Sequence, residues 1–223
     1  MNWQLISFFG DSTVLLPSAA ALFIVLMLRK TSRLLAWQWS LLFGITGAIV
    51  CASKLAFMGW GLGIRELDYT GFSGHSALSA AFWPIFLRLL SARFSVGLRK
   101  AAVITGYVLA AVVGYSRLVI HAHSVSEVIA GLLLGAAGSA LFLVLQKRTP
   151  DPESVYISWG GVACPVMVPL ILLHSGSKAP TQSLLGQIAT AVGPLALYAY
   201  RSPQAGLVIA ICFTGEIKFS PVN

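Results

Sequence analysis

Two segments of the chain, 54–76 and 114–127, contain residues that are suited to phosphate chemistry. Together they hold three of the four histidines, with Lys54, Arg65 and Arg117. Lysine and arginine side chains bind phosphate oxygens, and histidine can act as a phosphoryl nucleophile or as a general acid. Ionisable groups beside apolar segments are costly, so they are candidates for function. These residue types predict a site for a phosphorylated ligand.

The spacing of these residues adds to that prediction. His123 and Glu127 are four residues apart, so on a helix they share a face. Glu127 could then hold one ring nitrogen and leave the other free to attack. Ser73 and Gly74 precede the apolar run 77–87, where a helix start would point free N–H groups at an anion.

Each of these features also has an ordinary interpretation. Ser73-Gly74 could be a simple helix start, and His121 an interfacial histidine. Lys54 and Arg65 could extend to the membrane surface as anchors. Zinc is a further alternative for three histidines and a carboxylate, although the spacing H-A-H-x3-E is not a standard zinc motif.

The composition indicates which elements must position these residues. The chain has 223 residues, of which 57% are hydrophobic and 10% charged, whereas a soluble domain has about 25% charged residues. Spanning helices need ~20 mostly apolar residues, and seven windows come close to that length while an eighth, 202–215, is short. The sequence therefore predicts an all-α fold, a polytopic transmembrane bundle of about 7 (6–8) spanning helices. The eight charge-free windows are 12–28, 34–53, 69–87, 101–116, 128–146, 154–177, 179–200 and 202–215.

The basic residues predict how the bundle is oriented. Although the net charge is +8, the positive side chains cluster in short loops between apolar windows, which is typical of membrane topology and argues against a nucleic-acid partner. If each window crosses once, three basic loops share one side, and the positive-inside rule makes it cytoplasmic. The N-terminus with Asp11 and the segments 54–75, 117–127 and 174–183 then face outward. The basic loops contain Arg29, Lys30 and Arg33; Arg88, Arg93, Arg99 and Lys100; and Lys147 and Arg148.

The chain is expected to divide near residue 148. Pro150 and Pro152 predict a turn there. We expect 1–148 to form a membrane-embedded phosphatase-like core and 149–223 to form a C-terminal apolar helical extension. Within the expected core, the fifth window contains small residues that suit close helix packing: Gly131, Gly135 and Gly138.

Taken together, the two polar segments resemble the type 2 phosphatidic acid phosphatase superfamily, whose pattern is K-x6-R-P, P-S-G-H and S-R-x5-H-x3-D. The resemblance covers roughly 54–145. The sequence departs from the pattern in three places. Gly61-Leu62 replaces Arg-Pro after Lys54, Phe72 replaces proline, and Glu127 replaces aspartate. The matching residues are Lys54, Ser73-Gly74-His75, Ser116-Arg117, His123 and, with its substitution, Glu127.

The resemblance implies a mechanism through a phosphohistidine, with no metal or other cofactor. His123 would attack phosphorus, Glu127 would orient it, and His75 would protonate the leaving oxygen. Water would then release the phosphate. Arg65 is a further candidate, as a substitute for the missing arginine of the first motif. The groups that would bind phosphate oxygens are Lys54, Ser73, the Gly74 amide and Arg117.

The resemblance also implies a lipid phosphate or pyrophosphate as substrate, such as undecaprenyl pyrophosphate, phosphatidylglycerophosphate or phosphatidic acid. The expected location is the cytoplasmic (inner) membrane, among membrane lipids, with the site on the periplasmic or extracellular side. Three alternatives stay open at this stage. They are a lipid phosphotransferase with the same intermediate, a catalytically weak membrane-binding relative, and a small transporter.

Overall fold

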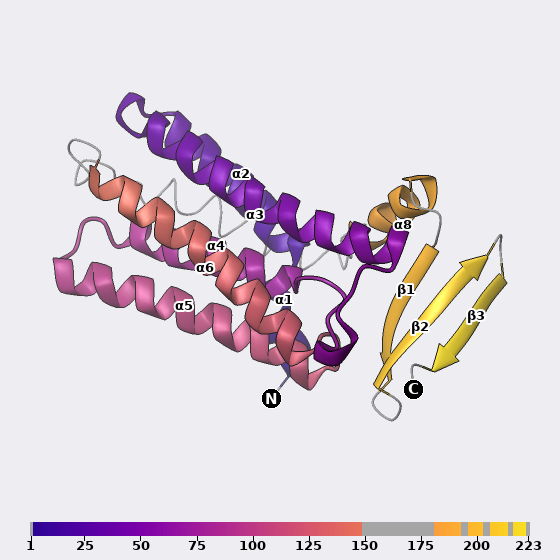
Figure 1. Ribbon diagram of the computed structural model, residues 1–223. Helices are drawn as coiled ribbons and strands as arrows, with labels where there is room; N and C mark the ends of the chain where they lie inside the picture. The colour runs from indigo at the N-terminus through magenta and orange to yellow at the C-terminus, as the bar shows by residue number, and fades with distance from the viewer. Residues whose placement is uncertain (1, 149–180, 193–195, 203–205, 214–215, 222–223) are drawn as a thin grey trace.

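A computed structural model describes residues 2–148, 181–192, 196–202, 206–213 and 216–221. Its main part is a bundle of long helices (Figure 1). These are α1 (Trp3–Phe8), α2 (Ser12–Met27), α3 (Arg33–Trp60), α4 (Gly74–Leu90), α5 (Val96–Val119) and α6 (Val125–Arg148). Two short 3-10 turns, Lys30–Ser32 and Arg65–Leu67, lie in the connections, and α8 (Thr181–Val192) packs against α3.

The bundle surrounds α4, which has its most extensive contacts with α5 and α6. Eleven of the 17 residues of α4 are buried, so this helix contacts protein rather than lipid over most of its surface. Aromatic side chains fill the space between α3 and α4, with the rings of Trp39 and Phe43 stacked 5.4 Å apart and that of Phe82 beside them. The central helix therefore has a fixed position, and its first turn is available to build a site.

Close contact between α6 and α4 sets the position of the site. A Cβ at Gly131 would come within 2.7 Å of the Ser73 carbonyl oxygen, and one at Gly135 would overlap the Ala77 carbonyl. Only glycine allows the two backbones to come this close. The prediction of close packing is confirmed at these two positions, and the contact brings the start of α6 beside the start of α4.

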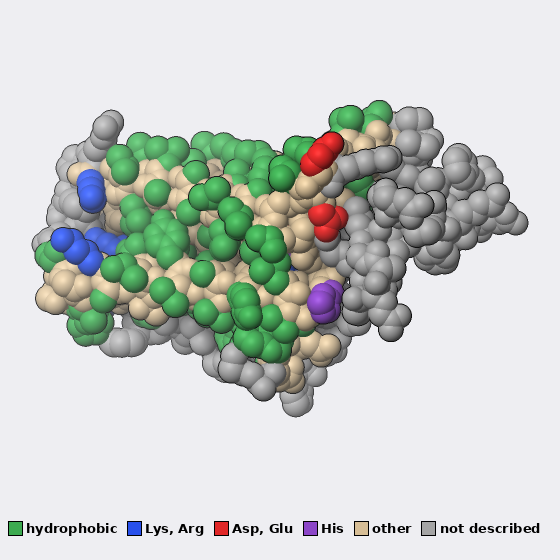
Figure 2. Space-filling view, turned by 60° about the horizontal axis from the view of Figure 1, so that its bottom comes forward, with side chains coloured by type: hydrophobic (Ala, Val, Ile, Leu, Met, Phe, Trp, Pro, Cys, Tyr) green, Lys and Arg blue, Asp and Glu red, His purple; other side chains and the backbone are tan. Residues whose placement is uncertain are grey.

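On the face of the bundle drawn in Figure 2, the charged side chains separate along its length. In Figure 2, lysine and arginine lie at one end, and aspartate, glutamate and histidine at the other, with a mainly hydrophobic surface between them. The α2–α3 and α4–α5 connections and the end of α6 lie at the same end (Figure 1). The predicted grouping of the three basic loops on one side is thus reproduced by the arrangement of the helices.

Four helical segments of the described chain are long and apolar enough to cross a membrane: Trp3–Met27, Lys30–Trp60, Val96–Val119 and Val125–Lys147. These segments indicate a membrane protein. The first five predicted windows correspond to α2, α3, α4, α5 and α6. The predicted total of about seven spanning helices is not confirmed, and the window 154–177 lies outside the described residues.

The C-terminal region differs from the prediction. The all-α expectation holds for the bundle, and α8 is helical, but the described residues between 196 and 221 form an antiparallel sheet of three strands in the order β1-β2-β3. The windows were identified by their lack of charge, which does not distinguish a helix from an apolar strand rich in β-branched and aromatic residues. The strands are β1 (Ala196–Ser202), β2 (Gly206–Phe213) and β3 (Glu216–Pro221).

Candidate active site

A cavity of about 680 Å³ lies at the acidic end of the bundle, opposite the basic loops. Five residues that the sequence singled out line it together. Lys54 comes from α3, Gly74 and His75 from the first turn of α4, Arg117 from the last turn of α5, and His123 from the turn before α6. The fold therefore brings both polar segments of the sequence to one cavity.

The third motif takes its spacing from a tight connection between two helices. Arg117 lies in the last turn of α5, and the turn 120–124 is closed by a hydrogen bond from the Ala122 amide to the Arg117 carbonyl at 3.0 Å. His121 adopts a left-handed backbone with a φ of 53°, and its side chain is exposed. The five residues between Arg117 and His123 thus let the chain turn and bring His123 to the cavity that Arg117 also lines.

The predicted pair of His123 and Glu127 is present. Nδ1 of His123 lies 2.7 Å from Oε2 of Glu127, and the Glu127 side chain is only 1% exposed. Since an ionised carboxylate can only accept, Nδ1 donates and Nε2 keeps its lone pair. One detail of the prediction changes, because His123 precedes α6 rather than lying on it.

Glu127 has more partners than the sequence suggested. Oε1 accepts hydrogen bonds from the Thr70 amide at 2.8 Å and from the Thr70 hydroxyl at 2.5 Å, and Oε2 also accepts from the Ser124 amide at 3.2 Å. A buried carboxylate needs such donors, since an unpaired buried charge is strongly unfavourable. Thr70 lies 57 residues earlier in the chain, so no local pattern indicated it.

The environment of His123 favours the neutral ring. Burial lowers the pKa of His123 to about 4, and the Glu127 hydrogen bond opposes this only in part, while the nearby charges of Lys54 and Arg117 add to the lowering. A histidine with this pKa is unprotonated at neutral pH. His123 is therefore in the form that a nucleophile requires.

The opposite wall of the cavity is the N-terminus of α4. The amides of the first helical turn have no acceptor within the helix, and Gly74 and His75 present theirs beside the cavity. Such amides, with the helix dipole, favour an anion. In addition, Nε2 of His75 lies 3.4 Å from Oδ2 of Asp11, the residue just before α2.

Arg117 reaches the cavity between these two walls. Its Nη1 donates to the Ser7 hydroxyl at 2.7 Å, whereas its Nε is buried and has no hydrogen-bond partner within the described chain. A buried donor without a partner is unfavourable. Arg117 and Lys54 line the same space, so an anionic ligand in the cavity would meet two cationic side chains.

Ser73, one of the predicted phosphate-binding residues, stands apart from this group. Ser73 is fully buried next to α6, where its hydroxyl accepts from Ser76 at 2.9 Å and its amide donates to the Glu127 carbonyl at 3.1 Å. It is not among the residues that line the cavity. Arg65 begins the 3-10 turn Arg65–Leu67, but its side chain lies outside the described structure, so its role stays a prediction.

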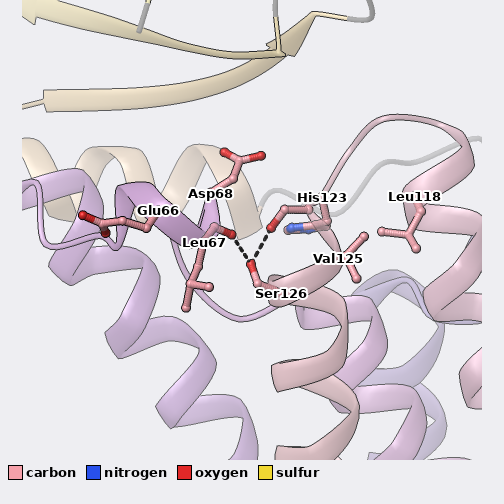
Figure 3. Close-up of a pocket in the computed structure, with 8 residues that line it drawn as sticks. Glu66, Leu67, Asp68, Leu118, His123, Val125 and Ser126 are labelled. Carbon is pink, nitrogen blue, oxygen red and sulfur yellow. Dashed lines mark hydrogen bonds between the residues drawn. The ribbon is translucent and has the colours of Figure 1, made fainter. Parts of the chain in front are cut away.

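A second hollow of about 560 Å³ lies on the other side of His123. Figure 3 shows Glu66 and Asp68 at its edge, and Ser126 hydrogen bonded to the Leu67 carbonyl at 2.6 Å. The Ser124 and Ser126 hydroxyls are 2.8 Å apart. These bonds fasten the 61–73 connection to the start of α6, which holds Thr70 against Glu127.

Sequence reasoning did not identify Thr70, Ser7 or Asp11 as parts of the site. Predicted topology had placed Asp11 on the same side as the polar segments, which was the only available signal. No group of three or more histidine, cysteine, aspartate or glutamate side chains suited to a metal ion occurs among the described residues.

Comparison with known proteins agrees with the site. The model of the PAP2 superfamily matches residues 50–151, and these residues contain all three motif segments. The chain is also 98% identical over 195 residues to a Klebsiella pneumoniae protein described as "Uncharacterized 22.5 kDa protein in cps region", a match that covers 87% of this chain and 93% of that protein. No solved structure matches the chain.

Residues 50–151 belong to the PAP2 superfamily, the type 2 phosphatidic acid phosphatases that the motifs resemble. Membership supports a membrane-bound phosphatase, a hydrolase of phosphoesters.

Proposed function

We propose that this protein is an integral membrane phosphatase that removes phosphate from a lipid phosphate or pyrophosphate through a phosphohistidine on His123. The observation that carries the proposal is one cavity lined by His123, His75, Lys54 and Arg117, with Glu127 behind the nucleophile. The second described hollow is also lined by His123, but no lysine or arginine lines it.

The first chemical step follows from the roles of the two histidines. Nε2 of His123 attacks phosphorus, the bond from phosphorus to the leaving oxygen breaks, and His75 gives that oxygen a proton. Lys54, Arg117 and the amides at the start of α4 bind the phosphoryl oxygens, where negative charge is held in the transition state. Such fixed donors are each worth ~3 kcal/mol of barrier.

The second step reverses these roles. His75, now neutral, takes a proton from water, and the resulting oxygen attacks the phosphohistidine. The bond from phosphorus to Nε2 breaks and inorganic phosphate leaves. Glu127 keeps the proton on Nδ1 throughout, so His123 returns to the form in which it began.

The shape of the cavity supports an amphiphilic substrate. Below the cationic group, its wall continues along α2, α3 and α4 with apolar or small residues. A phosphate would occupy the polar end while a hydrocarbon chain covered the apolar wall, which would remove that surface from water. The residues of this wall are Leu16, Phe43, Gly44, Gly47, Val50 and Leu78.

The proposed orientation places the site at the outer face of the cytoplasmic (inner) membrane, on the periplasmic or extracellular side. It is supported by the basic loops at the opposite end of the bundle and by the preference of such loops for the cytoplasm. Undecaprenyl pyrophosphate, phosphatidylglycerophosphate and phosphatidic acid all have a phosphate that this site would accept.

The direct test is release of phosphate by purified protein in detergent with EDTA present. Undecaprenyl pyrophosphate, phosphatidic acid and phosphatidylglycerophosphate serve as substrates, and His123→Ala as the matched variant. We expect release that EDTA does not abolish and that the variant loses by at least about 10³-fold. Equal release by the variant would contradict the proposal, and phosphate found on an added alcohol would indicate a phosphotransferase.

The apolar wall has its own test. A Cβ at Gly47 would have ordinary contact with Leu78 at 3.9 Å, so Gly47→Phe places a ring in the apolar part of the cavity. We expect hydrolysis of long-chain phosphatidic acid to fall about 10-fold while short-chain substrate is nearly unaffected. The control is Ile45→Phe, since Ile45 is 46% exposed on the same helix; equal loss on both chain lengths would argue against a lipid at this wall.

A further inference from the structure

The N-terminal segment 3–13 lies before the residues that match the PAP2 superfamily, yet it forms part of the cavity. The Ser7 and Asp11 side chains both line it. Ser7 accepts a hydrogen bond from Arg117, and Asp11 pairs with His75. Two residues of the proposed machinery therefore have partners that the family pattern does not include.

This segment is fixed against the helices that carry the site. The Trp83 indole N–H donates to the Phe9 carbonyl at 3.1 Å, and the rings of Trp3 and Tyr115 meet edge to face at 5.4 Å. A Cβ at Gly10 would lie 2.8 Å from the Ser79 hydroxyl oxygen and 3.1 Å from the His75 carbonyl. The chain thus passes close to α4 at the residue before Asp11.

The two oxygens of Asp11 have different partners. Oδ1 caps α2, accepting from the Thr13 amide at 2.8 Å and from the Thr13 hydroxyl at 2.6 Å. Oδ2 faces Nε2 of His75 at 3.4 Å. Because the cap fixes the carboxylate, the second oxygen is held in position toward the imidazole.

A positioned carboxylate is what a general acid in this cavity requires. The charged groups that face His75 are Asp11, Lys54 and Arg117. The positive charges of Lys54 and Arg117 repel a proton on the ring. Of these three groups, only the Asp11 carboxylate attracts it. With Nε2 directed to Asp11, Nδ1 is the nitrogen that remains to serve the leaving oxygen.

We propose that Asp11 is a positioning residue for His75, which holds its Nε2–H and so prepares Nδ1 to give a proton to the leaving oxygen. This proposal rests on the proposed function, because His75 needs such a partner only if it protonates a leaving group. Asp11 itself does not touch the reacting atoms. In the first step the Nδ1 proton passes to the leaving oxygen, and Nε2–H stays with Asp11.

The test uses Asp11→Asn, because asparagine caps a helix about as well as aspartate. The variant therefore keeps the α2 cap and loses the charge that faces His75. The full-length protein is assayed on phosphatidic acid, whose alkoxide leaving group needs a proton, and on p-nitrophenyl phosphate, whose leaving group does not. Glu66→Gln is the matched control, since it makes the same charge change on an exposed side chain at the same end of the bundle.

We expect Asp11→Asn to slow phosphatidic acid hydrolysis about 10- to 100-fold, within the range that general acids contribute, and to slow p-nitrophenyl phosphate hydrolysis less than about 3-fold. Asp11→Glu should recover part of the loss. Equal losses on both substrates would show a merely structural residue. Unchanged hydrolysis of phosphatidic acid would overturn the proposal. Faster hydrolysis would also overturn it, because the Asp11 charge would then act only by repelling the substrate phosphate.

A second measurement does not depend on turnover. In protein labelled at histidine, NMR should show the His75 ring protonated at Nε2 and hydrogen bonded, and this signal should be lost in Asp11→Asn. The same His75 signal in both proteins would overturn the proposal even if the activity is that of a phosphatase. Conversely, a loss of the signal in a protein without any phosphatase activity would contradict the proposed function and leave the Asp11–His75 contact established.

Discussion

The two pairs of histidine and carboxylate differ in how firmly they are held. His123 and Glu127 are 2.7 Å apart, and the carboxylate has three further donors and is 1% exposed. His75 and Asp11 are 3.4 Å apart, with side chains 22% and 30% exposed. The first pair is buried where the 61–73 connection meets the start of α6, and the second lies where a separate segment meets the bundle.

The difference corresponds to two tasks. A nucleophile must keep one tautomer and one orientation through both steps, so a rigid partner suits it. A general acid must lose a proton and regain it, so its surroundings must accept both charge states. A closer, fully buried carboxylate at His75 would hold that proton too firmly.

The largest expected effect comes from the rigid pair. Glu127→Gln keeps the size of the side chain but removes the charge that keeps the proton on Nδ1, so we expect phosphate release to fall on the order of 10³- to 10⁴-fold. Glu127→Asp should lose less, because the charge remains while the reach to Thr70 shortens.

The comparison of the two pairs gives this prediction its control. Asp11→Asn makes the same change from carboxylate to amide at the other histidine, and its loss should be at least about 10-fold smaller. Both variants are assayed together on phosphatidic acid. If Asp11→Asn were the more damaging of the two, the assignment of nucleophile and acid would have to be exchanged.

A smaller effect is expected from the support behind Glu127. Thr70→Val removes the hydroxyl donor to Oε1 but keeps the amide donor. Loss of a hydrogen bond to a buried charge costs ~1–3 kcal/mol, so thermal unfolding should begin at lower temperature and hydrolysis should slow about 10-fold. Thr70→Ser, which keeps the hydroxyl, should behave like the natural protein, and a stable, fully active Thr70→Val would show that Glu127 does not depend on this bond.

The smallest effect is expected from pH. The pKa of His123 is lowered to about 4 by burial, so the proton that would block Nε2 binds only as the pH falls through that value. Between about pH 7 and about pH 5, protonation of His123 should remove only about a tenth of the active form. The measurement is kcat/KM on p-nitrophenyl phosphate, which does not need the acid. A rate that falls to half near the ordinary histidine pKa would contradict the buried, neutral nucleophile.

Much of the site followed from the sequence because its signals are local. The fixed spacing from Arg117 to His123 and Glu127 is a helix end, a turn and a helix start, and hydrophobic windows located all of those helices. Thr70 and Asp11 could not be found in this way, since they meet Glu127 and His75 across 57 and 64 residues through packing alone. The strands at 196–221 were missed because absence of charge marks an apolar segment without indicating its secondary structure.

The central claim is that His123 carries the phosphoryl group during turnover. The most direct test is to mix the protein with phosphatidic acid bearing a radiolabelled phosphate, stop the reaction in alkali, where phosphohistidine survives, and locate the label by peptide mapping. We predict label on the peptide that contains His123 in the natural protein and none on this peptide in His123→Ala. In Glu127→Gln the label should increase only if hydrolysis of the phosphohistidine is slowed more than its formation. Hydrolysis of phosphatidic acid by the natural protein with no label on His123 at any time, or with label that persists in His123→Ala, would contradict the account.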